Sequence, residues 1–570
     1  MRTDSFCDRI SIVVGSWWTE PHRTSDLGDQ CPAFVVLTRE SSSIGVAATQ
    51  HPPRCFLGST SPGTFPPCTV SAVTLKPLRA TLPGALRQRP PYRESQHHTM
   101  VELTVLTDEQ VEAIHQATLR ILAEVGVVLS QPEACNILLE AGARIQGDRV
   151  LLPPDLVERA LAHCPRQVQV SDRASRTITL GNGSLHWHNL GGARDLYDPE
   201  SGQRRAATIE EVRTSARLLD ALENATTITP FFTPQDVPGP LMSLAMYRHT
   251  LPHTTKPVQG PGVQMAAEVE MAVRMAAVIG PPAEILTLSV SPISPLLFPD
   301  GLVEAILEIS RQGIAFAPLP CPTAGATAPM SLAGALAQQN AELLTALTLA
   351  QHVRPGLPTI YCGRLAMMEP RSGISVWGGV ELGLASAATM QLGHRYGLPV
   401  NVYGFSTNSH TLEIQNGFER SLNAAIPALA GADELSGIGE MAAGVMGSYA
   451  QMVCDDEIAA SVYRLRRGFA VDEDSLAVAV IAAAMDGPRN FLSEKHTVRH
   501  LRAGEILATK LAERRDWDEW TRSGREGMAE RAHSKAMDLL AEHEVVPLLA
   551  AQEQELDEIM KEAEARLLPG

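Results

Sequence analysis

Between residues 226 and 467, short apolar and β-branched runs alternate with longer stretches in which apolar positions recur every three or four residues. The short runs predict buried strands, because a strand of a parallel sheet is covered on both faces. The longer stretches predict amphipathic helices. The predicted strands are 226–232, 257–260, 285–291, 314–319, 358–362, 399–403 and 434–438, with one more at 185–190, and the predicted helices include 264–279, 300–312, 332–351, 379–396 and 417–430.

Serial strand–helix units predict a parallel sheet, because each parallel pairing needs a crossover connection. The fold class is therefore α/β, and the number of units favours a closed (β/α)8 TIM barrel with its core at 226–467. An open Rossmann sheet is the alternative. No G-x-G-x-x-G motif follows a predicted strand, however, and the chain has no G-x-x-x-x-G-K-[ST] phosphate loop.

The regions that flank the barrel pattern differ from it. Residues 100–225 predict an N-terminal accessory region with two capping boxes, Thr107 with Gln110 and Thr208 with Glu211, each opening an amphipathic helix. Residues 468–570 predict a C-terminal helical region. Residues 1–99 are rich in Pro, Ser, Thr, Arg and His with little periodicity, so we expect a disordered or non-native extension upstream of a start at Met100.

The overall composition disfavours two classes of protein. The chain of 570 residues is globular by composition, and its net charge of −17 argues against binding the phosphate backbone of a nucleic acid. No apolar run approaches the ~18–20 residues that span a bilayer, so no membrane segment is predicted. The nine cysteines form no CxxC pair, which indicates a reduced, cytoplasmic protein.

The residues directly after the predicted strands are expected to carry the chemistry. Parallel strands bring their carboxyl ends to one mouth, where barrel enzymes place their ligands. The run 399–403 breaks into the polar segment 406–410, Ser-Thr-Asn-Ser-His, before a helical pattern resumes. Aromatic, small and neutral polar residues follow the other strands in the same way. This composition predicts a pocket for a small organic molecule.

Several blocks of the chain resemble the trimethylamine:corrinoid methyltransferase family. They are EAIHQATLRILAEVGVVL (112–129), QQNAELLTALTLAQHVRPGLPTIYCG (338–363), ELGLASAATMQLGHRYGLPV (381–400) and SYAQMVCDDEIAASVYRLRRGFAVDEDSLAVAVI (448–481). The similarity runs in order over about 103–555. Because the chain contains only standard residues, it resembles the members without pyrrolysine, such as glycine betaine methyltransferases.

The resemblance implies a TIM barrel that moves a methyl group from a methylated amine to the Co(I) of a corrinoid carried by a partner protein. It implies no tightly bound cofactor on this chain. We also expect a homo-oligomer. The cobalt would be the nucleophile, so the protein need only bind the amine, exclude water and aim one N-methyl group. A quaternary ammonium already has a neutral leaving group, which favours a quaternary over a tertiary substrate.

Aromatic rings suit a cation whose charge disperses in the transition state, with each cation–π contact worth ~0.5–2 kcal/mol. Candidates for a cage are Phe231, Tyr361, Trp377, Tyr403 and Phe405, with Phe232 and Trp187 as further aromatics. Tyr403 and Phe405 are two residues apart, so a continued strand would place both on one face. His410 and Arg364 are candidates to bind a betaine carboxylate, and Glu440, after a predicted strand, to orient a partner group.

Two alternatives stay open. A zinc-assisted methanol or thiol methyltransferase would need metal ligands, for which His186 with His188 and the cluster 454–457 are the candidates. Neither has the spacing of a recognised zinc site, and the cluster reads as the start of a helix with favourable acidic residues. A noncatalytic amine-binding or corrinoid-docking protein is the other alternative, and it would bind ligand without transferring a methyl group.

Overall fold

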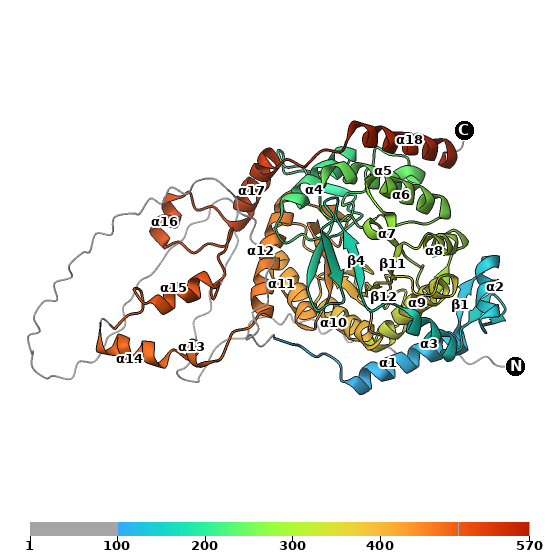
Figure 1. Ribbon diagram of the computed structural model, residues 1–570, viewed down its shortest axis with the longest axis horizontal. Coiled ribbons are helices and arrows are strands. Elements are labelled where there is room, and N and C mark those ends of the chain that lie inside the picture. Colours follow the sequence, from blue (N-terminus) through green and yellow to red (C-terminus); the bar gives the residue numbers. More distant parts are fainter. Residues whose placement is uncertain (1–100, 261, 488, 569–570) are drawn as a thin grey trace, which may run out of the picture. The chain divides into compact units, whose positions relative to one another are not determined.

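The computed structural model describes residues 101–260, 262–487 and 489–568 (Figure 1). The predicted extension at 1–99 and the predicted start at Met100 lie outside these residues. Among the described helices, none is both long enough and apolar enough to cross a membrane.

Eight parallel segments form a closed barrel. Regular pairing joins β9 to β11, and β13 through β16 and β17 to β6. Backbone hydrogen bonds outside the regular ladders close the remaining gaps. Among them are those from Phe316 N–H to Pro358 O (2.8 Å), Gly260 N–H to Thr287 O (2.8 Å), Ile228 N–H to Pro257 O (2.9 Å) and Thr226 N–H to Trp187 O (2.8 Å). The barrel strands are β6 (His186–Asn189), β9 (Thr287–Val290), β11 (Ala315–Pro318), β13 (Tyr361–Gly363), β16 (Val400–Tyr403) and β17 (Glu434–Ile438).

The predicted TIM barrel is therefore confirmed, and the open Rossmann alternative is wrong. Two predicted strands, 226–232 and 257–260, are present only as extended segments joined by the isolated bridge of Ile228 to Val258. Pro230 and Pro257 explain this, because a proline has no N–H to donate to a ladder. Since β6 is a barrel strand, the barrel begins before the predicted boundary at residue 226.

Helices surround the barrel in the predicted order, with ends within one turn of those predicted (Figure 1). They are α4 (Ile209–Ala221), η2 (Gly239–Leu241), α5 (Met242–Thr250), η3 (Leu251–His253), α6 (Ala266–Ile279), α7 (Pro282–Ile285), α8 (Asp300–Gln312), α9 (Leu332–Val353), α10 (Val380–Arg395), α11 (Ile414–Leu429) and α12 (Tyr449–Arg466). Glu211 accepts from the N–H of Thr208 (2.8 Å), which confirms the capping box that opens α4.

The alternation of side chains along the strands separates two cores. Phe316 and Tyr361 point outward and join the main cluster between strands and helices. Their neighbours Ala315, Ala317, Ile360 and Cys362 point inward and pack against Val168, Val170 and Leu180. The latter belong to the hairpin of β4 (Val168–Ser171) and β5 (Thr177–Leu180). The barrel interior is thus packed against a hairpin and is not an open channel.

The accessory region packs mainly on α9 through α1, α2 and α3. Thr107 and Gln110 form the predicted capping box of α1. A four-stranded sheet in the order β10-β1-β3-β2 ties this region to the barrel. The elements are α1 (Asp108–Arg120), η1 (Ile121–Val125), β1 (Val127–Leu129), α2 (Pro132–Glu140), β2 (Arg144–Gln146), β3 (Arg149–Leu151), α3 (Pro154–His163) and β10 (Leu297–Phe298).

The C-terminal region consists of helices. Of these, α17 packs on α12 and α18 packs on α6. Figure 1 shows α13, α14 and α15 standing apart from the barrel helices. The helices are α13 (Glu473–Leu476), α14 (Val478–Asp486), α15 (Lys495–Arg502), α16 (Trp517–Arg522), α17 (Met528–Glu542) and α18 (Ala550–Leu567).

Two small sheets form from the loops that follow the barrel strands. One has the order β18-β19-β7-β8 and the other β12-β14-β15. Their strands are β7 (Asp195–Tyr197), β8 (Arg204–Ala206), β18 (Glu440–Met441), β19 (Met446–Gly447), β12 (Thr323–Ala324), β14 (Ala366–Met368) and β15 (Ser375–Val376). Because each follows the carboxyl end of a barrel strand, these sheets build the walls of the mouth.

Candidate active site

A cavity of about 420 Å³ lies at the carboxyl end of the barrel. The residues around it follow β6, lie near the ends of β15 and β16, or form the turn between β18 and β19. They are Leu190, Gly191, Gly192, Arg194, Trp377, Tyr403, Ala443, Gly444 and Val445. Ala442 and Ala443 have left-handed φ values of 51° and 61°, a backbone conformation that costs energy in a residue with a side chain.

The aromatic corner of this cavity consists of Trp377 and Tyr403. Their rings meet edge to face, with centroids 5.2 Å apart and an interplanar angle of 70°. The guanidinium of Arg364 lies 4.7 Å from the centroid of the Tyr403 ring. Arg364 is itself buried and donates to the carbonyl of Gly363 (3.1 Å) and to the carbonyl (2.9 Å) and side-chain oxygen of Asn401. Arg364 therefore supports the Tyr403 ring, and its guanidinium already has hydrogen-bond acceptors within the protein.

The polar segment after β16 holds Trp377 in place. The side-chain oxygen of Asn408 accepts from the backbone N–H of Trp377 and of Gly378, both at 2.7 Å. Glu419 of α11 accepts in turn from the Thr407 hydroxyl (2.6 Å) and the Asn408 N–H (3.0 Å). A Cβ atom at Gly378 would lie 2.2 Å from a Glu419 carboxyl oxygen, so only glycine fits there. The segment thus builds the aromatic corner indirectly.

Glu440 is a buried carboxyl group close to the cavity. Its Oε2 lies 3.6 Å from the point where a Cβ would stand on the cavity residue Gly444. Burial raises the pKa of Glu440 to about 7, although Arg420 and Ser406 oppose the rise. The Oε1 atom of Glu440 has no hydrogen-bond partner among the described residues. Burial and the neighbouring Glu440 together raise the pKa of the Tyr403 hydroxyl well above its ordinary value.

A buried ion pair fixes the backbone that presents Glu440. Arg420 and Asp455 are both fully buried, and Arg420 Nε donates to Asp455 at 2.7 Å. Arg420 also donates to the carbonyls of Glu440 (2.6 Å) and Gly437 (3.0 Å), while Asp455 accepts from the Gly439 N–H (2.8 Å). Because both charges have several partners, the pair is a rigid clamp on the exit of β17.

A second buried network lies inside the barrel around Glu434. This carboxylate accepts from Thr227 (2.7 Å), Gln259 (2.8 Å) and Asn401 (2.5 Å). Burial alone would raise the pKa of Glu434, but these hydrogen bonds and the nearby His188 hold it below its ordinary value. Burial lowers the pKa of His188. Asn401 links this network to Arg364 and so to the Tyr403 ring.

The structure brings four of the predicted site residues together at the mouth, namely Arg364, Trp377, Tyr403 and Glu440. The other four lie elsewhere. Phe405 stacks on Trp187 with centroids 4.7 Å apart, outside the barrel wall. The expectation that Tyr403 and Phe405 share a face is wrong, because β16 ends at Tyr403.

Tyr361, Phe231 and His410 do not reach the cavity either. The Tyr361 hydroxyl donates to Asn340 of α9 (2.7 Å), so its ring packs between strand and helix. Phe231 packs edge to face on Phe232, with centroids 4.6 Å apart, in the main core. His410 is exposed, and its backbone carbonyl accepts from the Tyr197 hydroxyl.

Sequence reasoning missed Arg194 and the turn at 443–445. Arg194 follows the pair Gly191-Gly192 after β6, which is a strand-exit signal that the sequence did carry. The turn at 443–445 has no comparable pattern. Its place depends on backbone hydrogen bonds from Ala442 to Ser409 O (2.9 Å) and from Ala443 to Thr407 O (2.8 Å), which join segments that are distant in the sequence.

The metal-ligand candidates do not form a site. Among the described residues, no three His, Cys, Asp or Glu side chains are arranged to hold a metal ion. The cluster 454–457 lies within α12, which begins at Tyr449 with Ser448 as its cap, so the reading of this cluster as a helix start is wrong. Its member Asp455 is instead the partner of Arg420.

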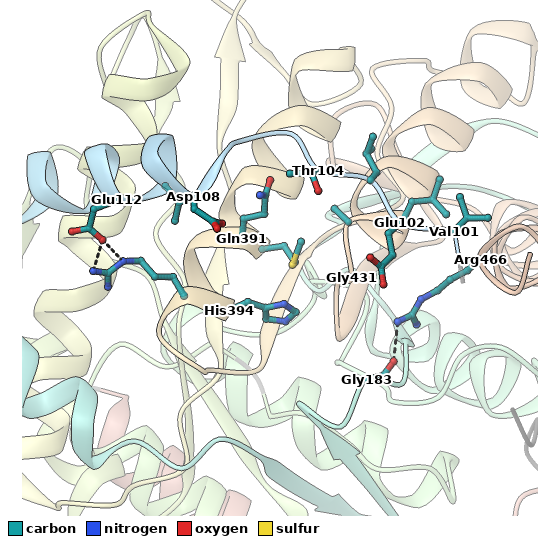
Figure 2. A pocket seen from close by; sticks show the side chains of 16 residues that line it. Val101, Glu102, Thr104, Asp108, Glu112, Gly183, Gln391, His394, Gly431 and Arg466 are labelled. Atoms are coloured by element: carbon teal, nitrogen blue, oxygen red, sulfur yellow. Dashed lines mark hydrogen bonds and ion pairs between the residues drawn. The ribbon is translucent and has the colours of Figure 1, made fainter. Parts of the chain in front are cut away.

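A larger cavity, of about 650 Å³, lies at the other end of the barrel (Figure 2). The extended segment from Val101, helix α10 and Arg466 form its walls. Several of the charged groups around it already have partners. Glu112 accepts from Arg395 (2.7 Å), His394 contacts Asp433 (2.9 Å), and Arg466 donates to Gly183 O (2.8 Å). Because barrel enzymes place their sites at the carboxyl end of the strands, the smaller cavity at the mouth is the better candidate site.

A barrel whose carboxyl-end mouth combines an aromatic corner, a buried carboxyl group and a left-handed turn has the arrangement of an enzyme that acts on a small polar or cationic substrate. The family model described as trimethylamine methyltransferase (MTTB) matches residues 84–567. The chain belongs to this family, and it is a methyltransferase.

Curated relatives match over most of their length. The chain is 29% identical to trimethylamine methyltransferase MttB of Desulfitobacterium hafniense (strain DSM 10664 / DCB-2), over 81% of this chain and 94% of the relative. It is also 29% identical to glycine betaine methyltransferase of Desulfitobacterium hafniense (strain Y51), over 77% and 92%. Among solved structures, the monomethylamine methyltransferase MtmB of Methanosarcina barkeri aligns at 13% identity with a TM-score of 0.43, over 75% of this chain and 92% of that chain.

Proposed function

We propose that this methyltransferase moves a methyl group from a quaternary amine such as glycine betaine to the Co(I) of a corrinoid carried by a partner protein. The observation that carries the proposal is the aromatic corner of Trp377 and Tyr403 on a cavity at the barrel mouth. A trimethylammonium group fits such a corner, because its diffuse charge is attracted by ring faces and needs no hydrogen-bond acceptor.

The corrinoid supplies the nucleophile when its carrier protein presents it at the mouth. The residues of this chain hold the ammonium group, exclude water and fix which methyl group faces the opening. As that methyl group leaves, the C–N electron pair returns to nitrogen, and a neutral tertiary amine is released. The positive charge on nitrogen disappears in this step, so a pocket that binds the cation only moderately suits the reaction.

Glu440 supports this requirement. A fully ionised carboxylate against the ammonium would stabilise the ground state more than the transition state. With a pKa raised by burial to about 7, Glu440 is partly protonated near neutral pH. It therefore contributes less negative charge to the pocket than an ordinary carboxylate does.

Arg194 is the side chain that we propose for binding the carboxylate of a betaine. It lines the cavity and its side chain is 58% exposed. Its contact to Asp195 is long, at 3.6 Å, and Asp195 is satisfied by Arg204 at 3.0 Å. The earlier candidate Arg364 already donates to Asn401 and Gly363. Arg194→Ala should weaken betaine binding about tenfold while leaving choline binding unchanged.

The partner corrinoid protein would cover the rim of the mouth. Three large apolar side chains on this rim are exposed, Val445 at 42%, Ile374 at 61% and Ile414 at 86%. Exposed apolar groups around an active-site opening suit a protein that docks and leaves in each cycle. The cytoplasmic location is a prediction that follows from a reduced, corrinoid-dependent reaction.

The test is anaerobic methyl transfer. The full chain is mixed with Co(I) cobalamin and, one at a time, glycine betaine, choline, trimethylamine, methanol or no donor, and the absorbance of methylated cobalamin is followed. Methylation from a quaternary amine is expected. Methylation from methanol alone would contradict the proposal, and methylation from trimethylamine alone would favour the tertiary amine as substrate. If no donor reacts, calorimetry with glycine betaine separates binding without catalysis from absence of a site.

A further inference from the structure

A fixed positive charge lies against one ring of the aromatic corner. Arg364 is buried, and the carbon of its guanidinium lies 4.7 Å from the centroid of the Tyr403 ring. Tyr403 in turn lines the cavity at the mouth. An arginine side chain keeps its charge in proteins. An ammonium group that binds the Tyr403 ring would therefore share this ring with a permanent cation.

The hydrogen-bond acceptors of Arg364 are neutral. Its guanidinium donates to the carbonyls of Gly363 (3.1 Å) and Asn401 (2.9 Å) and to the side-chain oxygen of Asn401. Arg420, in the clamp beneath the mouth, is different because it contacts the carboxylate of Asp455 directly. The charge of Arg364 is therefore held in place by dipoles rather than by an ion pair.

A compensating carboxylate lies one residue further along this network. The side chain of Asn401 accepts from Arg364 with its oxygen, and its Nδ2 donates to Glu434 (2.5 Å). Glu434 is fully buried inside the barrel, where it also accepts from Thr227 (2.7 Å) and Gln259 (2.8 Å). Asn401 thus keeps the two charges apart. The positive end of the resulting dipole lies at Tyr403, and its negative end lies in the barrel interior.

Glu440, a second carboxyl group near Tyr403, offsets this positive charge only in part. The influence of both groups reaches the ring, because Glu440 raises the pKa of the Tyr403 hydroxyl and Arg364 lowers it. Burial raises the pKa of Glu440 itself to about 7, so this carboxyl group is only partly ionised near neutral pH. The Arg364 guanidinium carries its full charge under the same conditions.

We propose that Arg364, acting through Tyr403, weakens binding of the ammonium ground state and thereby speeds methyl transfer. This inference rests on the proposed function. In the transfer step the methyl carbon accepts the electron pair of the cobalt while the C–N electron pair returns to nitrogen, so the ammonium charge disappears. The repulsion from Arg364 is then relieved on the way to the transition state, and a repulsion present only in the ground state lowers the barrier.

The test compares a cationic ligand with a neutral ligand of the same shape. Calorimetry measures the binding of choline and of 3,3-dimethyl-1-butanol to the full chain. Arg364→Met should bind choline about 10-fold more tightly than wild type, because two like charges on the order of 10 Å apart repel by about this factor at an effective dielectric constant of ~20. The affinity for the neutral alcohol should not change.

Two further variants change the charge in other ways. Arg364→Lys keeps the positive charge and should bind choline within about threefold of wild type. Glu434→Gln removes the distant negative charge and leaves Arg364 in place, so it should weaken choline binding about threefold, in the direction opposite to Arg364→Met. Because Glu434→Gln does not alter Arg364, it tests the same charge separation even where Arg364→Met does not fold.

Kinetics separate this role from a purely structural one. With the donor that wild type uses, Arg364→Met should lower kcat about 3–10-fold without raising KM, whereas a damaged pocket would raise KM. Unchanged or weaker choline binding in Arg364→Met, or weaker binding of both ligands, would overturn the inference and leave the proposed reaction intact. A wild type that binds no quaternary amine would overturn both.

Discussion

The two ends of the barrel each carry a cavity, and they differ in how their polar groups are satisfied. At the amino end the cavity is larger, about 650 Å³, and Glu112, Arg395 and His394 on its wall are paired. At the mouth it is about 420 Å³, yet Glu440 Oε1 is buried without a hydrogen-bond partner among the described residues, and two alanines are left-handed. Unsatisfied and strained groups persist where a ligand or a reaction needs them, so they mark the site better than volume does.

The largest expected effect comes from breaking the clamp beneath the mouth. Arg420→Met leaves Asp455 buried without its cation, and we expect a loss of about 3–5 kcal/mol in the free energy of unfolding. Urea unfolding at pH 7 measures this loss. The matched control, Arg566→Met, removes a half-exposed arginine paired with Glu270 and should lose about 0–1 kcal/mol. Equal losses in both variants would mean that the clamp has no special role.

Glu440→Gln tests the buried carboxyl group at the mouth. Burial raises the pKa of Glu440 from 4.5 to about 7. Between these two pH values the carboxyl group is therefore protonated in the folded protein and ionised in the unfolded chain. The contribution of Glu440 to stability therefore falls as pH rises through this window, by about 3 kcal/mol. The variant should lack this fall, which unfolding at pH 5 and pH 8 would show.

Glu434→Gln, inside the barrel, is the control, because Glu434 should change stability with pH in the opposite direction to Glu440. The pKa of Glu434 is held below its ordinary value, so its contribution is present above the unfolded pKa and lost as pH falls. This variant should therefore be destabilised at neutral pH and less so in acid. The same pH dependence in the Glu440 and Glu434 variants would contradict the account of the mouth.

Trp377→Leu tests the aromatic corner. Removing one cation–π partner should weaken binding of a quaternary amine by about 10–30-fold, equivalent to ~1.4–2 kcal/mol, with little change in thermal stability. Phe405→Leu should lower thermal stability and leave amine binding nearly unchanged, because Phe405 stacks on Trp187 in the core. Trp517→Leu, a change at a 69% exposed tryptophan remote from the mouth, should alter neither property. Calorimetry and a thermal melt measure both quantities.

Asn408→Ala should have a smaller effect of the same kind. It removes the acceptor for the backbone of Trp377 and Gly378, so the indole loses its fixed position. We expect kcat/KM to fall about 3–10-fold. In the Trp377→Leu background the same change should add almost nothing, because both changes act on one group. A fully additive loss would assign Asn408 another role.

The smallest effect is expected at the opposite end of the barrel. Gln391 lines the larger cavity, accepts from Val105 and Leu106 (3.0 Å each) and donates to the carbonyl of Leu106 (2.8 Å). Gln391→Ala should cost about 1 kcal/mol of stability and leave kcat/KM unchanged. A large loss of activity would move the site to this cavity.

The barrel could be predicted from the sequence because strand and helix periodicity are local properties of the chain. It overestimated regular pairing only where prolines remove ladder donors, at 226–232 and 257–260. It identified Trp377, Tyr403, Arg364 and Glu440, which all lie in or just after strands that end at the mouth. The barrel begins before the predicted boundary at residue 226, because β6 lies far before the other barrel strands in the sequence.

The remaining errors concern the direction of a side chain. Successive side chains of a strand point to opposite faces. Tyr361 was expected in the mouth, but its side chain points outward and packs in the main core between strands and helices. The prediction that Phe405 lies in the mouth was wrong because β16 ends two residues before it, at Tyr403. Arg194 and the turn at 443–445 depend on contacts between distant segments, which periodicity does not report.

A crystal structure with arsenobetaine, a trimethylarsonium analogue of glycine betaine whose arsenic scatters anomalously, would show whether a betaine binds in the mouth. We expect one anomalous peak per chain beside Trp377 and Tyr403, with the carboxylate toward Arg194. A peak in the cavity near Val101 and His394, or full occupancy elsewhere with an empty mouth, would contradict it.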